Sequence, residues 1–487
     1  MIKNCLCFLA ISACITSSAQ VTTTGVNPEK KEPVASTATT MVSSDANADS
    51  YTGPRLPKDY YWMKMDNGLE VVVIENHKVP LATIEIAVKN GAYTEGPEYS
   101  GLSHLFEHMF FKANKEYPDQ EKFIRRTEEL GMVWNGTTDV ERVNYFFTFD
   151  KDSLMAGLQF MNAAIRFPIY RTEDMQKERP VVDGEFQRGE SDPGFQLWIE
   201  VQKKCWGELF TRKNPIGEHD VINTATPEKM MTIKDKYYFP NNSILVICGD
   251  VNPREAFEYA QKVFYDWKKS DFDPHEKFPI PEFAPLKQSQ VFIKESAIAQ
   301  TPYIMVQWHG PDYRTDSAGT VIADVFSEIL RLNSSKWQQA LIDKGLATYA
   351  DISYTTNKYV GPIQLFAIPN PEKMQEFYQE MLNQISQFGN ADYFTQEQIA
   401  TAKEVIKRNK IRNSEKPSSL ASQLTYQWCS TSLEYFTDYT EACMTVCKED
   451  LQKYAKKYMV DQYNISGMII SPDMNKRYAP QNYFKQR

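Results

Sequence analysis

Histidine, cysteine and long hydrophobic runs are scarce in this sequence. Beyond the first twenty residues, no stretch approaches the roughly 18 consecutive apolar residues that a membrane-spanning helix needs, so no such helix is predicted there. The net charge is −9 and no long run of Lys or Arg occurs, which excludes the basic surface expected of a nucleic-acid-binding protein. Only five of the eight cysteines lie beyond residue 20, without the density of a disulfide framework or the spacing of a thiolate metal site. We therefore expect most of them to be buried free thiols.

The length and composition indicate a globular protein with more than one folded unit. A chain of 487 residues exceeds what a single hydrophobic core usually holds. Hydrophobic residues make up 42% of the chain and charged residues 24%, which is typical of globular proteins and excludes a fibrous or disordered class.

The first twenty residues have the pattern of an export signal. Lys3 precedes a short apolar run, and Ser17-Ser18-Ala19 offers small residues for cleavage before Gln20, so we predict a signal peptide over residues 1–19. The alternative is the segment Ile11-Ser12-Ala13-Cys14, which resembles a bacterial lipobox and would place a lipid anchor on Cys14. Residues 20–55 are polar and predict a flexible tether. An exported protein of the periplasm or cell envelope is expected in either case.

The hydrophobic periodicity predicts an α+β chain built from two similar halves. We expect strands over residues 69–75, 82–88 and 243–248 and helices over residues 101–111, 151–167 and 253–267. Four prolines between residues 274 and 285 predict a linker over residues 271–288, which separates an N-terminal domain (56–270) from a C-terminal domain (289–487). Residues 303–308 and 317–332 repeat the early strand and helix, and residues 457–470 repeat residues 236–248. Two copies of one α+β unit are the economical interpretation.

A pair of histidines marks the candidate site. His104 and His108 stand four residues apart with Glu107 between them, so in a helix all three side chains leave one face. Two imidazoles on adjacent turns can bind one zinc ion, and the carboxylate beside them can take a proton from metal-bound water. The alternative is two surface histidines and an ordinary helix charge. We favour the zinc site because the chain has only six histidines and because apolar neighbours would pack this helix into a core.

The residues around this pair resemble those of a known family. His104-Leu105-Phe106-Glu107-His108 has the H-x-x-E-H pattern of the inverzincins. With Gly91-Ala92-Tyr93-Thr94-Glu95 before it and Met109-Phe110-Phe111-Lys112 after it, the chain resembles the family of pitrilysin, insulin-degrading enzyme and the mitochondrial processing peptidase. The resemblance implies two homologous sheet-and-helix repeats that enclose a substrate cavity. It also implies a zinc-dependent endopeptidase that hydrolyses peptides or unfolded segments, with Glu107 as the general base.

The resemblance further implies the remaining members of the metal site. In that family the third zinc ligand is a glutamate that follows the motif after 76 residues, and 76 residues separate His108 from Glu185 here. Glu178, two helical turns earlier, matches a glutamate that supports the ligands without binding the metal. One Zn²⁺ per chain, held by His104, His108 and Glu185, is therefore expected. Without the resemblance, the two glutamates are charges on a solvated helix, in which Pro180 predicts a bend.

Two substrate-binding residues are also assigned by resemblance. Asn135 lies in a segment similar to the family's edge strand, to which an extended peptide adds as a further strand. An ordinary asparagine turn is the alternative for this residue. Tyr349 matches a tyrosine of the second repeat that holds the substrate in relatives.

The second repeat departs from the family pattern. Ile342 stands where many relatives have a substrate-binding arginine, and no H-x-x-E-H occurs there, so the C-terminal domain is expected to bind no zinc. The alternative to a self-sufficient enzyme is therefore a non-catalytic subunit, or a chain that is active only in a heterodimer with a homologous partner. A homodimer also remains open.

Overall fold

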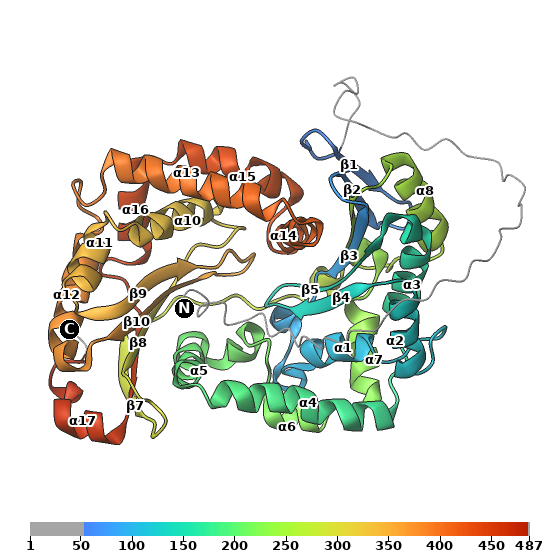
Figure 1. Cartoon of the computed structure of the whole chain (residues 1–487). Coiled ribbons are helices and arrows are strands. Elements are labelled where there is room, and N and C mark those ends of the chain that lie inside the picture. The colour runs from blue at the N-terminus through green and yellow to red at the C-terminus, as the bar shows by residue number, and fades with distance from the viewer. Residues whose placement is uncertain (1–52, 486–487) are drawn as a thin grey trace, which may run out of the picture.

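The computed structural model describes residues 53–485 and consists of two α+β units, each built around its own sheet (Figure 1). This confirms the predicted fold class. The signal peptide predicted at residues 1–19, the candidate anchor at Cys14 and most of the tether predicted at residues 20–55 lie outside the described residues. Within the described range, no helix combines the length and the apolar character needed to cross a membrane.

The first unit contains a six-stranded sheet in the order β1-β2-β6-β3-β5-β4. Its strands are β1 Tyr60–Lys64, β2 Glu70–Glu75, β3 Leu81–Val88, β4 Val133–Thr138, β5 Val143–Asp150 and β6 Ser243–Gly249. Neighbouring strands are antiparallel except for β2 and β6, which are parallel. The helices of this unit are α1 Leu102–Phe110, α2 Gln120–Glu129, α3 Leu154–Arg166, α4 Thr172–Glu190, α5 Pro193–Trp206, α6 His219–Asn223, α7 Pro227–Tyr237 and α8 Pro253–Phe264.

The second unit repeats this topology. Its strands are β7 Gln290–Glu295, β8 Tyr303–His309, β9 Ala347–Tyr354, β10 Pro362–Pro369 and β11 Ile465–Ile470, in the order β7-β11-β8-β10-β9. Strand for strand, this order corresponds to β2-β6-β3-β5-β4 of the first sheet. The parallel pair β7 and β11 corresponds to the parallel pair β2 and β6. The helices are α10 Ser317–Arg331, α11 Lys336–Gln338, α12 Met374–Gln387, α13 Gln396–Asn413, α14 Pro417–Ser430, α15 Leu433–Thr445, α16 Lys448–Tyr458 and α17 Pro472–Tyr478. The predicted internal repeat is confirmed.

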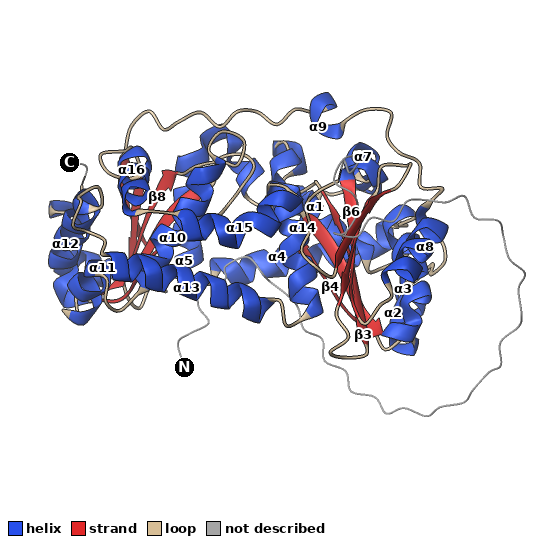
Figure 2. Cartoon of the chain, turned by 90° about the horizontal axis from the view of Figure 1, so that it is seen from above, coloured by secondary structure: helices blue, strands red, loops and turns tan. Residues whose placement is uncertain are grey.

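Each sheet is covered on one face by helices of its own unit and on the other face by a helix of the other unit. Helix α5 packs on β8 and β11, whereas α14 packs on the corresponding strands of the first sheet, β3 and β6 (Figures 1 and 2). Leu424 and Trp428 of α14 join Val72 and Val246 in one apolar cluster. Because both faces of β6 are covered, all of its residues are buried, which explains its uninterrupted apolar sequence.

The segment between the two units runs along the outside of the molecule (Figure 2). It has little regular structure apart from α9, Pro274–Lys277. Cys205, Cys248, Cys429 and Cys443 are buried free thiols as expected, whereas Cys447 is exposed.

Candidate metal centre

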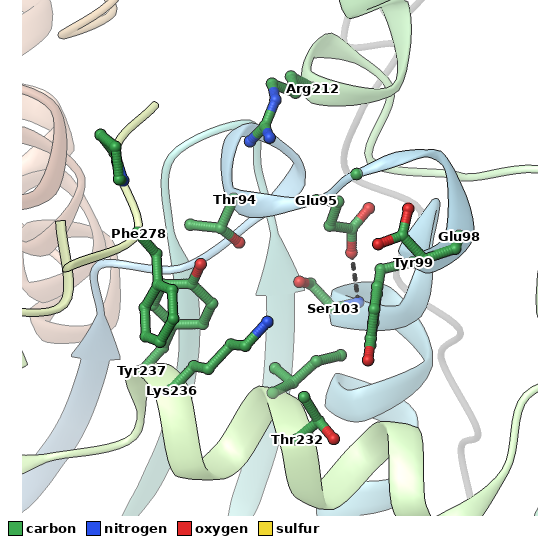
Figure 3. A pocket seen from close by; sticks show the side chains of 13 residues that line it. Thr94, Glu95, Glu98, Tyr99, Ser103, Arg212, Thr232, Lys236, Tyr237 and Phe278 are labelled. Carbon is green, nitrogen blue, oxygen red and sulfur yellow. Dashed lines mark hydrogen bonds between the residues drawn. The ribbon is translucent and has the colours of Figure 1, made fainter. Parts of the chain in front are cut away.

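Helix α1 carries the two histidines and begins at a glycine. Gly101 caps the helix with φ of 85°, a left-handed conformation that glycine adopts without strain. The buried Glu95 carboxylate accepts hydrogen bonds from the backbone N–H groups of Gly101 (2.7 Å) and Ser103 (2.6 Å), and Figure 3 shows the second of these. A carboxylate at this position satisfies N–H groups that the helix itself leaves free and interacts favourably with the helix dipole. The side chain of Glu95 therefore fixes the start of α1. Glu95 and Ser103 also line a pocket of about 180 Å³.

The structure brings His104, His108 and Glu185 together from two helices. Glu185 Oε2, on α4, lies 3.6 Å from His104 Nε2 and 3.7 Å from His108 Nε2. Donors bound to one tetrahedral zinc ion are about 3.4 Å apart, so both distances to Glu185 are close to the spacing that the metal requires. All three donor atoms lie within 4.8 Å of one another. Two imidazoles and one carboxylate are also a donor set that zinc binds.

Glu185 itself points to a missing partner. Its side chain is 2% exposed, and its Oε2 atom is buried without a hydrogen-bond partner. A buried carboxylate oxygen that is left unpaired is costly, and a cation at this position would satisfy it. Burial raises the pKa of Glu185 above its ordinary value and lowers the pKa of His104 to about 3. His104 is therefore a neutral imidazole with a lone pair available for a metal.

His108 is held by a second carboxylate, that of Glu178. The distance from His108 Nδ1 to Glu178 Oε1 is 2.9 Å, and Lys112, which lies just beyond the end of α1 at Phe110, pairs with the other carboxylate oxygen. Burial tends to raise the pKa of Glu178, but the hydrogen bonds from His108 and Lys112 outweigh it and lower that pKa. Burial tends to lower the pKa of His108, but the hydrogen bond with Glu178 and the neighbouring carboxylates outweigh it and raise that pKa. The contact of Nδ1 with Glu178 orients the ring so that Nε2 is the nitrogen that faces Glu185.

The side chain of Glu107 lies against β4, the edge strand of the first sheet. The Thr138 hydroxyl donates a 2.7 Å hydrogen bond to Glu107 Oε2. Gly136 leaves room for this carboxylate, because a Cβ atom at residue 136 would lie 2.7 Å from Glu107 Cγ. Burial raises the pKa of Glu107 to about 7, although the hydrogen bond from Thr138 and the charge of His108 oppose the shift.

The two residues expected to bind substrate lie on the edge strands of the two sheets. Asn135 is in β4, where its side-chain oxygen accepts a hydrogen bond from the backbone N–H of Gly136. Tyr349 is in β9, half-buried, with its ring 6.2 Å from that of Phe366 between the two units. Ile342 lies in a short π-helical turn, Gln339–Asp343, before β9.

Sequence reasoning missed the contacts that Lys112 and Thr138 make in this site. The spacing of Lys112, four residues after His108, was a partial signal, because a continuous helix would place both on one face, whereas α1 ends at Phe110. No local pattern indicated Thr138, which reaches Glu107 only through the folding of β4 against α1. Helix α4 continues through Pro180, and the bend expected there stays a prediction.

Comparisons with known proteins agree with this architecture. The family model "Insulinase (Peptidase family M16)" matches residues 70–203, and the model "Peptidase M16 inactive domain" matches residues 224–406. The chain is similar to the Zinc protease PqqE of Helicobacter pylori, with 24% identity over 427 residues that cover 86% of this chain and 94% of the relative. Three other curated relatives are longer, and the chain spans only 22–23% of their lengths.

Solved structures show the same fold. A protease from Helicobacter pylori superimposes with a TM-score of 0.77 at 23% identity, covering 85% of this chain and 100% of the other. The first half of the periplasmic protease PqqL from Escherichia coli gives a TM-score of 0.67 at 14% identity, covering 88% of this chain and 97% of that chain. The two units described above are therefore the architecture of these proteases.

Proposed function

The chain belongs to peptidase family M16, and on this premise we propose that it is a zinc-dependent endopeptidase that cleaves peptides or unfolded protein segments. The observation that carries the proposal is the buried Glu185 Oε2 atom, which has no hydrogen-bond partner and faces the Nε2 atoms of His104 and His108. One Zn²⁺ per chain would be held by these three side chains.

The other residues of the site have distinct roles in this proposal. A zinc ion held by His104, His108 and Glu185 would supply Lewis-acid polarisation of the scissile carbonyl and would make the attacking water easier to deprotonate. Glu107 then accepts the proton of the attacking water and passes it to the leaving amine. The hydrogen bond from Thr138 fixes the orientation of the Glu107 carboxylate, and Glu178 fixes that of the His108 ring.

The substrate would bind along β4. This strand is the outer edge of the first sheet, and an edge strand presents a row of backbone groups that an extended peptide can pair with. Val133 at its start is 68% exposed. Such binding requires an extended chain, so it favours flexible peptides over folded proteins. We assign Asn135, in β4 itself, and Tyr349, in β9 of the second unit, to substrate binding.

A second candidate function is a subunit that depends on a partner. The match of residues 224–406 to the inactive-domain model and the presence of Ile342 where relatives have an arginine both favour it. In that case, this chain would supply the zinc site and a homologous chain would supply the missing substrate contact, in a heterodimer or a homodimer.

We also propose that the protein is exported to the periplasm or cell envelope. The support is the signal-like pattern of residues 1–19 and the periplasmic location named for PqqL of Escherichia coli. Mass spectrometry of the mature N-terminus distinguishes cleavage before Gln20 from a lipid anchor on Cys14.

The zinc content and peptidase activity of the purified chain test the function directly. We expect one zinc per chain by elemental analysis and cleavage of a quenched-fluorescent, unstructured peptide. Glu107→Gln should retain the zinc and lose activity by at least about a hundredfold, because the proton acceptor is gone. Turnover near the wild-type rate in this variant would show that Glu107 is not the general base. If the chain binds zinc but cleaves the peptide only after a homologous chain is added, the partner-dependent alternative would be established.

A further inference from the structure

A short segment outside the metal-binding helices touches both of them. Residues 214–225, called here the bracing segment, comprise Asn214-Pro215-Ile216-Gly217, the short helix α6 and the residues that follow it. We propose that the bracing segment sets the position of α4 relative to α1, and thereby the geometry of the three zinc donors, with His219 as its positioning residue. The inference rests on the proposed zinc function.

On the α1 side, the contact is between two glycine backbones. A Cβ atom on Gly217 would lie 2.4 Å from the Cα atom of Gly101, and a Cβ atom on Gly101 would lie 2.6 Å from the Cα atom of Gly217. Gly217 is further held by Asn214, whose side-chain amide donates a 2.9 Å hydrogen bond to the Gly217 carbonyl. The bracing segment is therefore in direct backbone contact with the residue at which α1 begins.

On the α4 side, His219 bridges two carboxylates of the same helix. Its Nδ1 atom lies 2.5 Å from Asp183 Oδ1 and its Nε2 atom lies 3.2 Å from Glu190 Oε2. The imidazole also stacks on the ring of Phe186, with centroids 4.0 Å apart and planes 9° from parallel. His219 thus contacts residues on both sides of Glu185.

Two further contacts fix the same stretch of α4. Asn223 donates a 3.1 Å hydrogen bond to Asp183, and Arg179 donates to the backbone carbonyls of Asn223 and Ala225. This stretch needs external support, because Pro180 provides no backbone N–H for the helical ladder. The bracing segment supplies it on the turns immediately before and after Glu185.

This arrangement matters because zinc tolerates little displacement of its donors. The donor atoms of His104, His108 and Glu185 come from two separate helices, so a shift of α4 along or away from α1 changes both distances to Glu185 at once. Groups that orient zinc ligands from outside the ligand set typically contribute 10–100-fold to metal affinity. His219 acts through the helix that carries Glu185, in contrast to Glu178, which contacts His108 directly.

The test measures the zinc dissociation constant of the full chain by competition with a chelator. His219→Ala should weaken zinc binding about tenfold, and His219→Asn, which retains a donor toward Asp183, should recover most of that loss. His77→Ala is the matched control, because His77 also bridges two carboxylates, Glu75 and Asp250, which lie outside α1, α4 and α6. This control should leave zinc affinity unchanged.

The outcomes separate this inference from the proposed function. At saturating zinc, His219→Ala should lower kcat and leave KM within about twofold, since β4 is untouched, whereas a merely structural role would lower the melting temperature alone. Wild-type zinc affinity and kcat in His219→Ala would overturn the inference even if the wild-type chain proved to be an active zinc peptidase. A wild-type chain that binds no zinc would instead overturn the proposed function, and with it the inference. If His219→Ala fails to fold, Asp183→Asn removes the charge partner and should weaken zinc binding similarly; unchanged affinity there would equally overturn the inference.

Discussion

Replacing Gly136 by alanine should displace Glu107 without altering any proposed zinc ligand. The new Cβ atom would lie 2.7 Å from Glu107 Cγ and 3.0 Å from its Oε1 atom, whereas ordinary contacts begin at 3.4 Å. The Glu107 side chain must therefore withdraw by about 0.7 Å, the difference between 3.4 and 2.7 Å. Displacements of about 1 Å in a catalytic site can cost about a hundredfold in rate. We expect kcat to fall about 10–100-fold, which corresponds to about 1.4–2.7 kcal/mol of transition-state stabilisation.

The assay is steady-state cleavage of an unstructured peptide, with zinc content and melting temperature measured in parallel. Gly184→Ala is the matched control: it adjoins Glu185, but apart from its chain neighbours and the backbone of its own helix, no atom lies within 4 Å of the position its Cβ would occupy. The control should retain wild-type kcat and zinc. A Gly136→Ala variant with full zinc and kcat within threefold of wild type would refute the reasoning that Glu107 must remain where the structure places it.

Three further changes test the ligand support, the acid stability and the packing of the two units. Glu178→Gln removes the charge that His108 faces and should weaken zinc binding about tenfold in a chelator titration; unchanged affinity would contradict that role. Burial lowers the pKa of His275 to about 4 from 6.5, so protonation favours the unfolded chain, and stability contributed by this residue should be lost as the pH falls from about 6.5 to 4. His275→Phe should lessen that loss in melting curves across this range, and parallel curves for both proteins would argue against it. Leu424→Ala should lower the free energy of unfolding by about 2–5 kcal/mol in urea titrations, since Leu424 is fully buried between α14 and the first sheet, and a change below about 1 kcal/mol would contradict that packing.

The local parts of the site could be predicted from the sequence because they depend on helix periodicity. His104, Glu107 and His108 share a helix face in any α-helix, and the apolar residues around them predicted that this helix packs into a core, as it does. Glu185 was different, because its distance from the motif was informative only through the resemblance to a family. Nothing in the sequence around Glu185 indicates that α4 lies against α1.

The contacts made across the fold could not be predicted. Gly136 and Thr138 reach Glu107 only because β4 folds against α1, and the resemblance of this segment to the family's edge strand did not indicate that contact. Likewise, the apolar sequence over residues 243–248 predicted a strand, but it could not indicate that α14, more than 160 residues later, covers one face of it. Tertiary partners of this kind depend on packing between units, which no short-range pattern encodes.

The exchange of α5 and α14 has a consequence for how the chain can be divided. Helix α5 of the first unit packs on β8 and β11 of the second, and α14 of the second unit packs on the equivalent strands β3 and β6 of the first. Such a reciprocal contact is the relationship found across the two-fold axis of a symmetric dimer. The chain is thus folded as a dimer of its own halves, with the connecting segment as a covalent tether between protomers. Either half produced alone would present a bare apolar sheet face to water, and we expect it to recover its solubility only when the other half is supplied in trans.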